Sequence, residues 1–343
     1  MKKLGLICIL DNWRLIERGQ KMTIEQQIIE KIKEYDKIII HRHTDPDPDA
    51  FGSQGGLAEV IRNSFPNKTV YQAGENDGSL TWITTEDELT DDMFKGALVI
   101  AIDTANRPRV DDQRYDQGDY LIKIDHHPDD DHYGDISLIN TGASSCSEMV
   151  VDLVNKSEGQ LVLNQKAARM LYAGIAGDTG RFMYDNTTAH TLRVTAQLFE
   201  FDINASEMNR KMDDISQGVA KLSAYVWDNM VMTEHNAAYI VLKHDLVKRF
   251  DLGAQGTAPI VSVIGKIDKV ICWTLFVEGE DGKYRLNIRS KGPVINELAK
   301  EYGGGGHPLA SGAMMDTLTD DQLKEYVAKL DQIAATYTGE KND

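Results

Sequence analysis

Three apolar runs of the sequence each end in an aspartate or a histidine, and this repeated pattern is the strongest constraint on the fold. The runs cover residues 37–43, 97–103 and 120–125, and they are short and branched enough to form buried strands. Helical patterns separate them, which favours a mostly parallel sheet with helices on both faces. Because the carboxyl ends of parallel strands meet at one edge of a sheet, the polar residues should gather there. The sequence therefore predicts an α/β domain with a site at that edge.

The first strand end continues into His43-Thr-Asp-Pro-Asp47-Pro-Asp49, where the spacing of the histidine and the aspartates fits a metal site. Asp and Pro both favour turns for local reasons, so this segment alone is equally compatible with a polar turn. The other strand ends decide between these interpretations, because they add Asp103 and the triplet Asp125-His126-His127. We also expect a helix at 54–64, with Gly52 and Ser53 leaving room at its start for a phosphate or a metal.

A helix expected at 164–176 leads to one more acid, Asp178, between two glycines. The donors collected in this way are all oxygen or imidazole groups: His43, Asp47, Asp49, Asp103, His126 and Asp178. They are too many for one tetrahedral zinc ion, and the set contains no thiolate, so a pair of octahedral ions such as Mn²⁺ is favoured. Two ions can activate a shared water and clamp the phosphate oxygens during in-line displacement. His127 is suited to donate a proton to the leaving group.

The length of 343 residues, 41% of them apolar, predicts about two domains. We expect an N-terminal extension at 1–22, a catalytic domain at 23–204, a helical linker at 205–228 and a smaller α/β domain at 229–338. Translation could instead begin at Met22, because the codons of Glu17-Arg18-Gly19 can form a purine-rich ribosome-binding site. The smaller domain should contain a hairpin ending in Arg289-Ser290 and a loop of four glycines before His307, whose amides can face an anion.

The net charge of −17 argues against binding to long nucleic acid, which needs a basic surface. Three cysteines, Cys8, Cys146 and Cys272, lie far apart and fit a reduced compartment, so we expect a cytoplasmic protein. No stretch approaches the roughly 18 uninterrupted apolar residues of a membrane helix.

Five motifs in order make the chain resemble the DHH-family phosphoesterases with a DHHA1 domain, in the branch of bifunctional oligoribonucleases and pAp phosphatases (nanoRNases; pAp is adenosine 3′,5′-bisphosphate). The resemblance covers about residues 24–335. The motifs are His43-Thr-Asp-Pro-Asp47-Pro-Asp49-Ala-Phe-Gly-Ser53, Ile102-Asp103-Thr-Ala-Asn106, Asp125-His126-His127-Pro128, Gly174-Ile-Ala-Gly-Asp178-Thr-Gly180 and Gly303-Gly-Gly-Gly-His307-Pro. Pro48 stands where the family often has glycine, and Asp45 adds an acid that we leave out of the ligand set.

The resemblance also implies roles for individual residues. One ion would be bound by His43, Asp47 and Asp103, and the other by Asp49, Asp103, His126 and Asp178, so that Asp103 bridges the two. The catalytic residues would be His127 and Asp125, and the substrate contacts Arg109, Arg289, Ser290, Gly306 and His307. The family uses two Mn²⁺ per chain, with Mg²⁺ or Co²⁺ as alternatives, and a homodimer is compatible with it.

The leading interpretation is a phosphoesterase that releases 5′-nucleotides from short RNA and removes the 3′-phosphate of pAp. A phosphodiesterase acting on linear or cyclic dinucleotides (pApA or c-di-AMP) is the alternative within the family. An inorganic pyrophosphatase would share the metal ligands, but Arg289-Ser290 and the glycine loop favour nucleotide substrates. A catalytically silent nucleotide sensor should lack at least one ligand, and none is missing.

Overall fold

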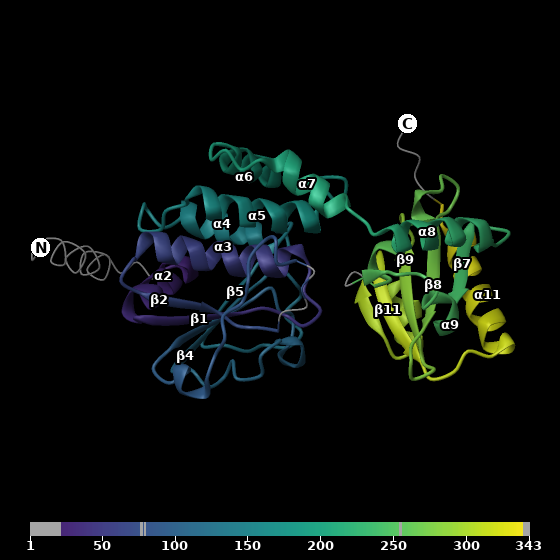
Figure 1. Ribbon diagram of the computed structural model, residues 1–343, viewed down its shortest axis with the longest axis horizontal. Coiled ribbons are helices and arrows are strands. Elements are labelled where there is room, and N and C mark those ends of the chain that lie inside the picture. The colour runs from purple at the N-terminus through teal and green to yellow at the C-terminus, as the bar shows by residue number, and fades with distance from the viewer. Residues whose placement is uncertain (1–21, 76–77, 79, 254–255, 339–343) are drawn as a thin grey trace, which may run out of the picture. The chain divides into compact units, whose positions relative to one another are not determined.

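The computed structural model describes residues 22–75, 78, 80–253 and 256–338, and these fall into two compact units. The first unit ends at Asp213 and the second begins at Asp214 (Figure 1). The expected extension at 1–22 lies outside the described residues except for Met22, as does the choice between Met1 and Met22 as the start. The expected domain limits and the 205–228 linker remain predictions.

The first unit is built on a sheet of five parallel strands in the order β2-β1-β3-β4-β5, which confirms the predicted α/β class. The strands are β1 (Lys37–His41), β2 (Thr69–Gln72), β3 (Leu98–Ile102), β4 (Tyr120–Asp125) and β5 (Ile136–Ile139). In the register, His41 lies beside Ala101 and Ile102 lies beside Ile124, so the strand ends that carry polar residues are neighbours.

Both faces of this sheet are covered: successive side chains of a strand point to opposite faces, and consecutive residues of β1 and β3 are buried. On one face, Ile38, Ile40 and Ile100 pack in a core with apolar residues of the α-helices (Figure 1). These helices are α2 (Ile24–Glu34), α3 (Pro48–Ser64), α4 (Cys146–Asn155), α5 (Gln165–Asp178), α6 (Ala189–Phe199) and α7 (Ala205–Asp213). On the other face, where helices were also expected, Ile39 and Val99 pack instead with residues of loops and of the segment around the short 3-10 helix η1 (Asp91–Met93).

Helix α3 begins at Pro48, not at Gln54, and its early start changes the interpretation of the residues before Gln54. Asp47 caps the helix and proline suits its first position, which is why the helix can start there. Gly52 and Ser53 therefore lie buried inside the helix, and the expectation that they leave room for a ligand was wrong. A Cβ on Gly52 would come within 2.5 Å of the Met170 carbonyl oxygen, so this glycine instead allows α3 and α5 to pack closely.

The second unit contains a mixed sheet of six strands in the order β10-β11-β9-β8-β7-β6. Its strands are β6 (Val231–Met232), β7 (Ala237–Leu242), β8 (Cys272–Glu278), β9 (Tyr284–Ser290), β10 (Gly305–His307) and β11 (Ala310–Met315). Strands β8 and β9 form the predicted antiparallel hairpin. The glycine run was expected to be a loop, but Gly305 and Gly306 belong to β10 and pair with β11.

Helices cover both faces of the second sheet (Figure 1). They are α8 (Gln217–Asn229), α9 (His244–Val247), η4 (Ala258–Ile260), η5 (Ile264–Lys266), α10 (Asn296–Glu301) and α11 (Asp320–Thr336). Phe276 packs with Tyr326 of α11 on one face, and its neighbour Leu275 packs with Leu222 of α8 on the other. Within the described ranges, no helix combines the length and the apolar composition needed to cross a membrane.

Candidate metal centre and active site

His43, Asp47 and Asp103 form a first donor group at the carboxyl ends of β1 and β3. The Nε2 atom of His43 lies 3.8 Å from Oδ2 of Asp47 and 3.6 Å from Oδ2 of Asp103. These separations are longer than direct hydrogen bonds, as expected for side chains that share an ion. The Nδ1 atom of His43 lies 2.7 Å from the carbonyl oxygen of Thr44 and can donate to it, which directs Nε2 towards the two acids.

Asp47 caps helix α3 and also belongs to the first donor group. Its Oδ1 atom accepts hydrogen bonds from the backbone N–H groups of Asp49 (2.9 Å) and Ala50 (3.0 Å), and so caps α3. Its Oδ2 atom faces His43. The start of α3 therefore fixes the position of a candidate ligand.

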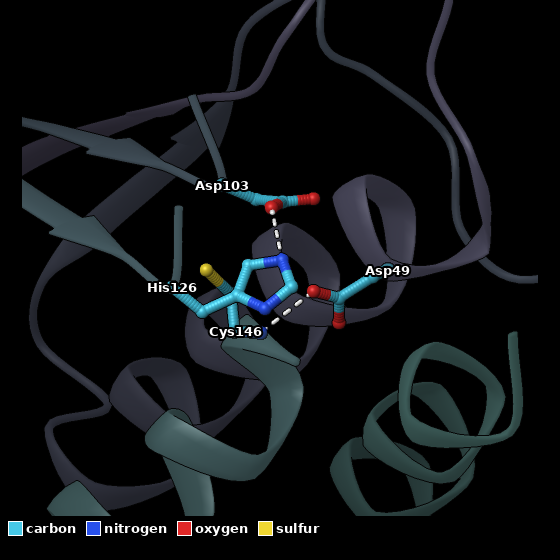
Figure 2. A group of neighbouring side chains, drawn as sticks. All are labelled: Asp49, Asp103, His126 and Cys146. Carbon is cyan, nitrogen blue, oxygen red and sulfur yellow. Dashed lines mark hydrogen bonds and ion pairs between the residues drawn. The ribbon is translucent and has the colours of Figure 1, made fainter. Parts of the chain in front are cut away.

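A second donor group consists of Asp49, Asp103, His126 and Cys146, whose potential ligand atoms all lie within 4.8 Å of one another (Figure 2). The Nε2 atom of His126 is 3.5 Å from Oδ1 of Asp103 and 3.3 Å from Oδ2 of Asp178, the last residue of α5. Both oxygens of Asp49 accept hydrogen bonds from the start of α4: Oδ2 from the backbone N–H of Cys146 (2.7 Å) and Oδ1 from that of Ser147 (2.9 Å).

Asp103 belongs to both donor groups and lies between them. Its side chain is buried, and its Oδ1 atom has no hydrogen-bond partner among the described residues. A buried carboxylate oxygen without a hydrogen bond is costly unless positive charge lies beside it. The arrangement therefore fits a pair of cations on either side of one shared carboxylate.

The electrostatics of the cluster favour bound cations. Burial opposes charge on His43, but the carboxylates of Asp103 and Asp47 outweigh it and raise the pKa of His43 to about 10. Burial, together with repulsion from neighbouring carboxylates, raises the pKa of Asp49 and of Asp178 well above the usual range. Carboxylates that repel one another in a buried cluster are stabilised by a positive ion among them.

His127 is held by its neighbour Asp125 and points its ring into the same cluster. Its Nδ1 atom lies 2.8 Å from Oδ1 of the buried Asp125 and 3.6 Å from Oδ1 of Asp103. Burial lowers the pKa of His127, but the hydrogen bond to Asp125 and the charge of Asp103 raise it overall. The ring is therefore oriented by one acid and is favoured in its protonated, donating form.

Arg109, predicted to contact substrate, lies beside the first donor group. It ends the 3-10 helix η2 (Arg107–Arg109), and its Nη2 atom is 3.2 Å from Nδ1 of His43 and 3.4 Å from the carbonyl oxygen of Thr44. The guanidinium group thus adds positive charge next to the candidate ligands. The extra acid Asp45 belongs to no donor group among the residues that the structure describes.

The predicted substrate residues of the second unit gather at one end of its sheet. Strand β11 runs between β9 and β10, and its Ala310 pairs with Arg289 on one side and with His307 on the other. The backbone N–H of Ser290 donates to the carbonyl oxygen of Leu309 (3.0 Å). Gly306 has a φ of +129°, and a Cβ there would come within 2.7 Å of the Ala310 carbonyl oxygen, so this position requires glycine.

Helix α4, and with it the position of Cys146 beside the site, was not predicted from the sequence. The predicted ligand set contained no thiol, whereas the structure places the Cys146 sulfur in the second donor group. A local signal for the helix was present, because Ser145 and Glu148 have the S-x-x-E spacing of a helix start. In the structure, the Ser145 hydroxyl accepts from the backbone N–H of Glu148 (3.0 Å).

Arg42, which anchors the loop beside His43, was also not predicted to matter for the site. Arg42 is fully buried, and its guanidinium group forms ion pairs with Asp111 and Glu86 and lies 4.4 Å from the ring centre of Phe51. A charge buried so deeply is stable only when it is paired in this way.

Comparison with known proteins identifies the class. The model of the DHH family, N-terminal domain, matches residues 37–175, and the model of the DHHA1 domain matches residues 236–336. The chain belongs to the DHH family of phosphoesterases, which are metal-dependent hydrolases, and it carries a DHHA1 domain.

Individual relatives narrow the similarity to one branch of that family. The chain is 52% identical over 301 residues to the probable bifunctional oligoribonuclease and PAP phosphatase NrnA of Streptococcus mutans, covering 88% of this chain and 96% of the relative. It is 44% identical over 291 residues to the bifunctional oligoribonuclease and PAP phosphatase NrnA of Bacillus subtilis, covering 84% and 93%. The crystal structure of an exopolyphosphatase-related protein from Bacteroides fragilis has the same fold, with a TM-score of 0.81, 24% identity and coverage of 91% and 97%.

Proposed function

We propose that this protein hydrolyses short oligoribonucleotides to 5′-nucleotides and removes the 3′-phosphate of pAp. The observation that carries the proposal is the pair of donor groups that share the buried Asp103. The relatives from Streptococcus mutans and Bacillus subtilis, both named bifunctional oligoribonuclease and PAP phosphatase, support the choice of substrates.

The cofactor in this proposal is a pair of Mn²⁺ ions, with Mg²⁺ or Co²⁺ as alternatives. His43, Asp47 and Asp103 would hold one ion, and Asp49, Asp103, His126 and Asp178 would hold the other. The donors are mainly carboxylates and imidazoles, which fit such ions, and burial together with neighbouring carboxylates raises the pKa of two of the carboxyl groups, Asp49 and Asp178. When bound, the two ions supply Lewis acidity towards a water molecule and towards the nonbridging oxygens of the phosphate.

The chain's own residues bind the substrate and transfer the proton. His127 donates from its ring to the reacting phosphate or leaving oxygen, while Asp125 holds the ring through Nδ1. Arg109, Arg289, Ser290, Gly306 and His307 bind the substrate's phosphates. A homodimer and a cytoplasmic location are further parts of the proposal that are compatible with the sequence.

The decisive experiment replaces the shared carboxylate. We expect Asp103→Asn and Asp103→Ala to lower kcat/KM for pAp and for a short RNA with Mn²⁺ by at least about a thousandfold, because both ions lose a ligand. The matched control is Asp45→Asn, which removes an acid near the donor groups but outside them, at a positive φ that asparagine tolerates. Mn²⁺-dependent turnover retained in Asp103→Ala would refute the shared-ligand assignment.

A substrate panel separates the proposed reaction from the related ones. The unsubstituted protein with Mn²⁺ is assayed on pAp, pApA, c-di-AMP, inorganic pyrophosphate and RNA of two to ten nucleotides. We expect the highest kcat/KM for pAp and the shortest RNA. Preferential turnover of c-di-AMP or pApA would instead assign the protein to dinucleotide hydrolysis.

A further inference from the structure

The second donor group contains a sulfur atom that the proposed pair of Mn²⁺ ions does not use. Cys146 is the first residue of α4 and is fully buried, with its sulfur near ligand atoms of Asp49, Asp103 and His126 (Figure 2). Its backbone N–H donates to Asp49 (2.7 Å), so one residue both positions a candidate ligand and adds a donor of another kind.

The environment of the sulfur leaves it available to a metal. The thiol makes a hydrogen bond to the carbonyl oxygen of Ile124 at 3.7 Å, and a thiol is a weak donor. Asp103 aims a buried oxygen without a hydrogen-bond partner into the same group.

We propose that Cys146 lets the second ion position bind a thiophilic divalent ion such as Zn²⁺ or Cd²⁺, held by Asp49, Asp103, His126 and the sulfur. One sulfur, one imidazole nitrogen and two carboxylate oxygens are four donors of the types that tetrahedral zinc binds. The thiol proton passes to solvent as the metal–sulfur bond forms. This inference rests on the proposed function, because it concerns one of the two ion positions assigned there.

The second ion position can then be occupied by either of two kinds of ion. Mn²⁺ prefers oxygen and nitrogen donors and has no need of the thiol, whereas Zn²⁺ gains from it. Four protein donors complete a tetrahedral ion and leave no open position on it for a substrate. Zinc held by Cys146 therefore competes with manganese and inhibits hydrolysis.

Cobalt is the probe for the metal–sulfur bond, since a thiolate bound to Co²⁺ gives an intense charge-transfer absorption in the near ultraviolet. The full chain is titrated with Co²⁺ in three forms: unsubstituted, Cys146→Ser, and the double variant Cys8→Ser/Cys272→Ser, which keeps Cys146 alone. Cys272 is a matched control, because it is also buried but belongs to the second unit, where its thiol donates to the Leu330 carbonyl oxygen (3.8 Å). We expect the band in the unsubstituted chain and the double variant, and its loss in Cys146→Ser.

A comparison of Cd²⁺ and Mn²⁺ affinities distinguishes a ligand from a merely structural residue. We expect Cys146→Ser to weaken Cd²⁺ binding by at least about tenfold, since loss of even an outer partner of a metal ligand has such an effect. The Mn²⁺ affinity should change less, whereas a general disturbance of the site would weaken both ions equally.

A cobalt band that persists in Cys146→Ser, or that is missing from the double variant, overturns the inference. Each variant tests it independently, so a folding failure of one leaves the other decisive. Turnover of pAp by the unsubstituted Mn²⁺ protein is measured separately. Turnover without the band overturns the inference alone, and the band without turnover overturns the proposed function alone.

Discussion

Asp103 can be shared by two donor groups because of its backbone as well as its side chain. It follows β3 directly and has a φ of +52°, in the left-handed region that aspartate tolerates better than most residues. Its N–H donates to the carbonyl oxygen of Ile124 (2.9 Å), which ties it to the neighbouring strand end. The turn therefore places one carboxylate between His43 and His126.

Gly174 leaves the space that Asp49 occupies. A Cβ at this position would lie 2.0 Å from Oγ of Ser147 and 2.6 Å from Oδ1 of Asp49. We expect Gly174→Ala to lower the free energy of unfolding by about 1–3 kcal/mol through overpacking, and to weaken Mn²⁺ binding by displacing Asp49. Chemical denaturation and calorimetric titration measure the two effects. The control is Gly142→Ala in an exposed loop, where a Cβ would lie 3.4 Å from its nearest atom, an ordinary contact distance. Equal losses of stability and of Mn²⁺ affinity in the two variants would contradict the role of Gly174.

Asp125 controls the protonation of His127, and this gives a pH prediction. The pKa of His127 is raised, so its donating form persists to higher pH and is lost as the pH rises through that value. Asp125→Asn keeps an acceptor for Nδ1 of His127 but removes the negative charge of the carboxylate. Loss of that charge lowers the pKa of His127. We expect the alkaline limb of the kcat profile to move to lower pH by at least about one unit. Asp129→Asn is the control, because the Asp129 carboxylate forms hydrogen bonds with Lys123 and with a different histidine, His132. If the alkaline limb does not move in Asp125→Asn, His127 is excluded as the proton donor.

At the scale of elements, the sequence predicted those parts of the site that depend on local patterns. Strand β4 was predicted with its observed limits, and β1 and β3 almost so, because an apolar run that ends in a polar residue is a local signal. The partners of Asp49 could not be predicted in the same way. They come from α4, about a hundred residues further along the chain, and only the folded sheet and helices bring the two together. The burial of Arg42 between Asp111 and Glu86 is likewise a result of long-range packing.

The first turn of α4 should therefore affect metal binding as well as the stability of the helix. Ser145 caps α4, and the next two backbone N–H groups hold Asp49. We expect Ser145→Ala to cost about 1 kcal/mol of stability and also to weaken Mn²⁺ binding, because the helix start frays. Thr319→Ala removes the equivalent cap of α11 in the second unit and should cost similar stability with unchanged Mn²⁺ affinity. Calorimetry on both variants checks this, and equal Mn²⁺ affinities would show that the α4 cap does not position Asp49.

At the scale of the whole molecule, the charge bears on the size of the substrate. A protein with a net charge of −17 repels a long polyanion, so attraction must come from bound ions and a few local cations. Among the proposed substrate contacts these cations are Arg109, Arg289 and, when protonated, His307. A longer RNA adds phosphates that these few cations do not neutralise, in a protein whose net charge is negative.

The salt dependence of turnover tests this limit. Each phosphate neutralised on a single strand contributes about −0.7 to the slope of log affinity against log salt, so contacts with Arg109 and Arg289 predict a slope near −1.4 for kcat/KM at saturating Mn²⁺. We expect Arg289→Gln to make the slope shallower by about 0.7. Arg285→Gln, an exposed arginine earlier on the same strand, should leave it unchanged. The slope should also stay constant as the RNA is lengthened, because the added phosphates find no cation. A slope that steepens with length would mean that the protein has an extended basic track, and the restriction to short substrates would then need another cause.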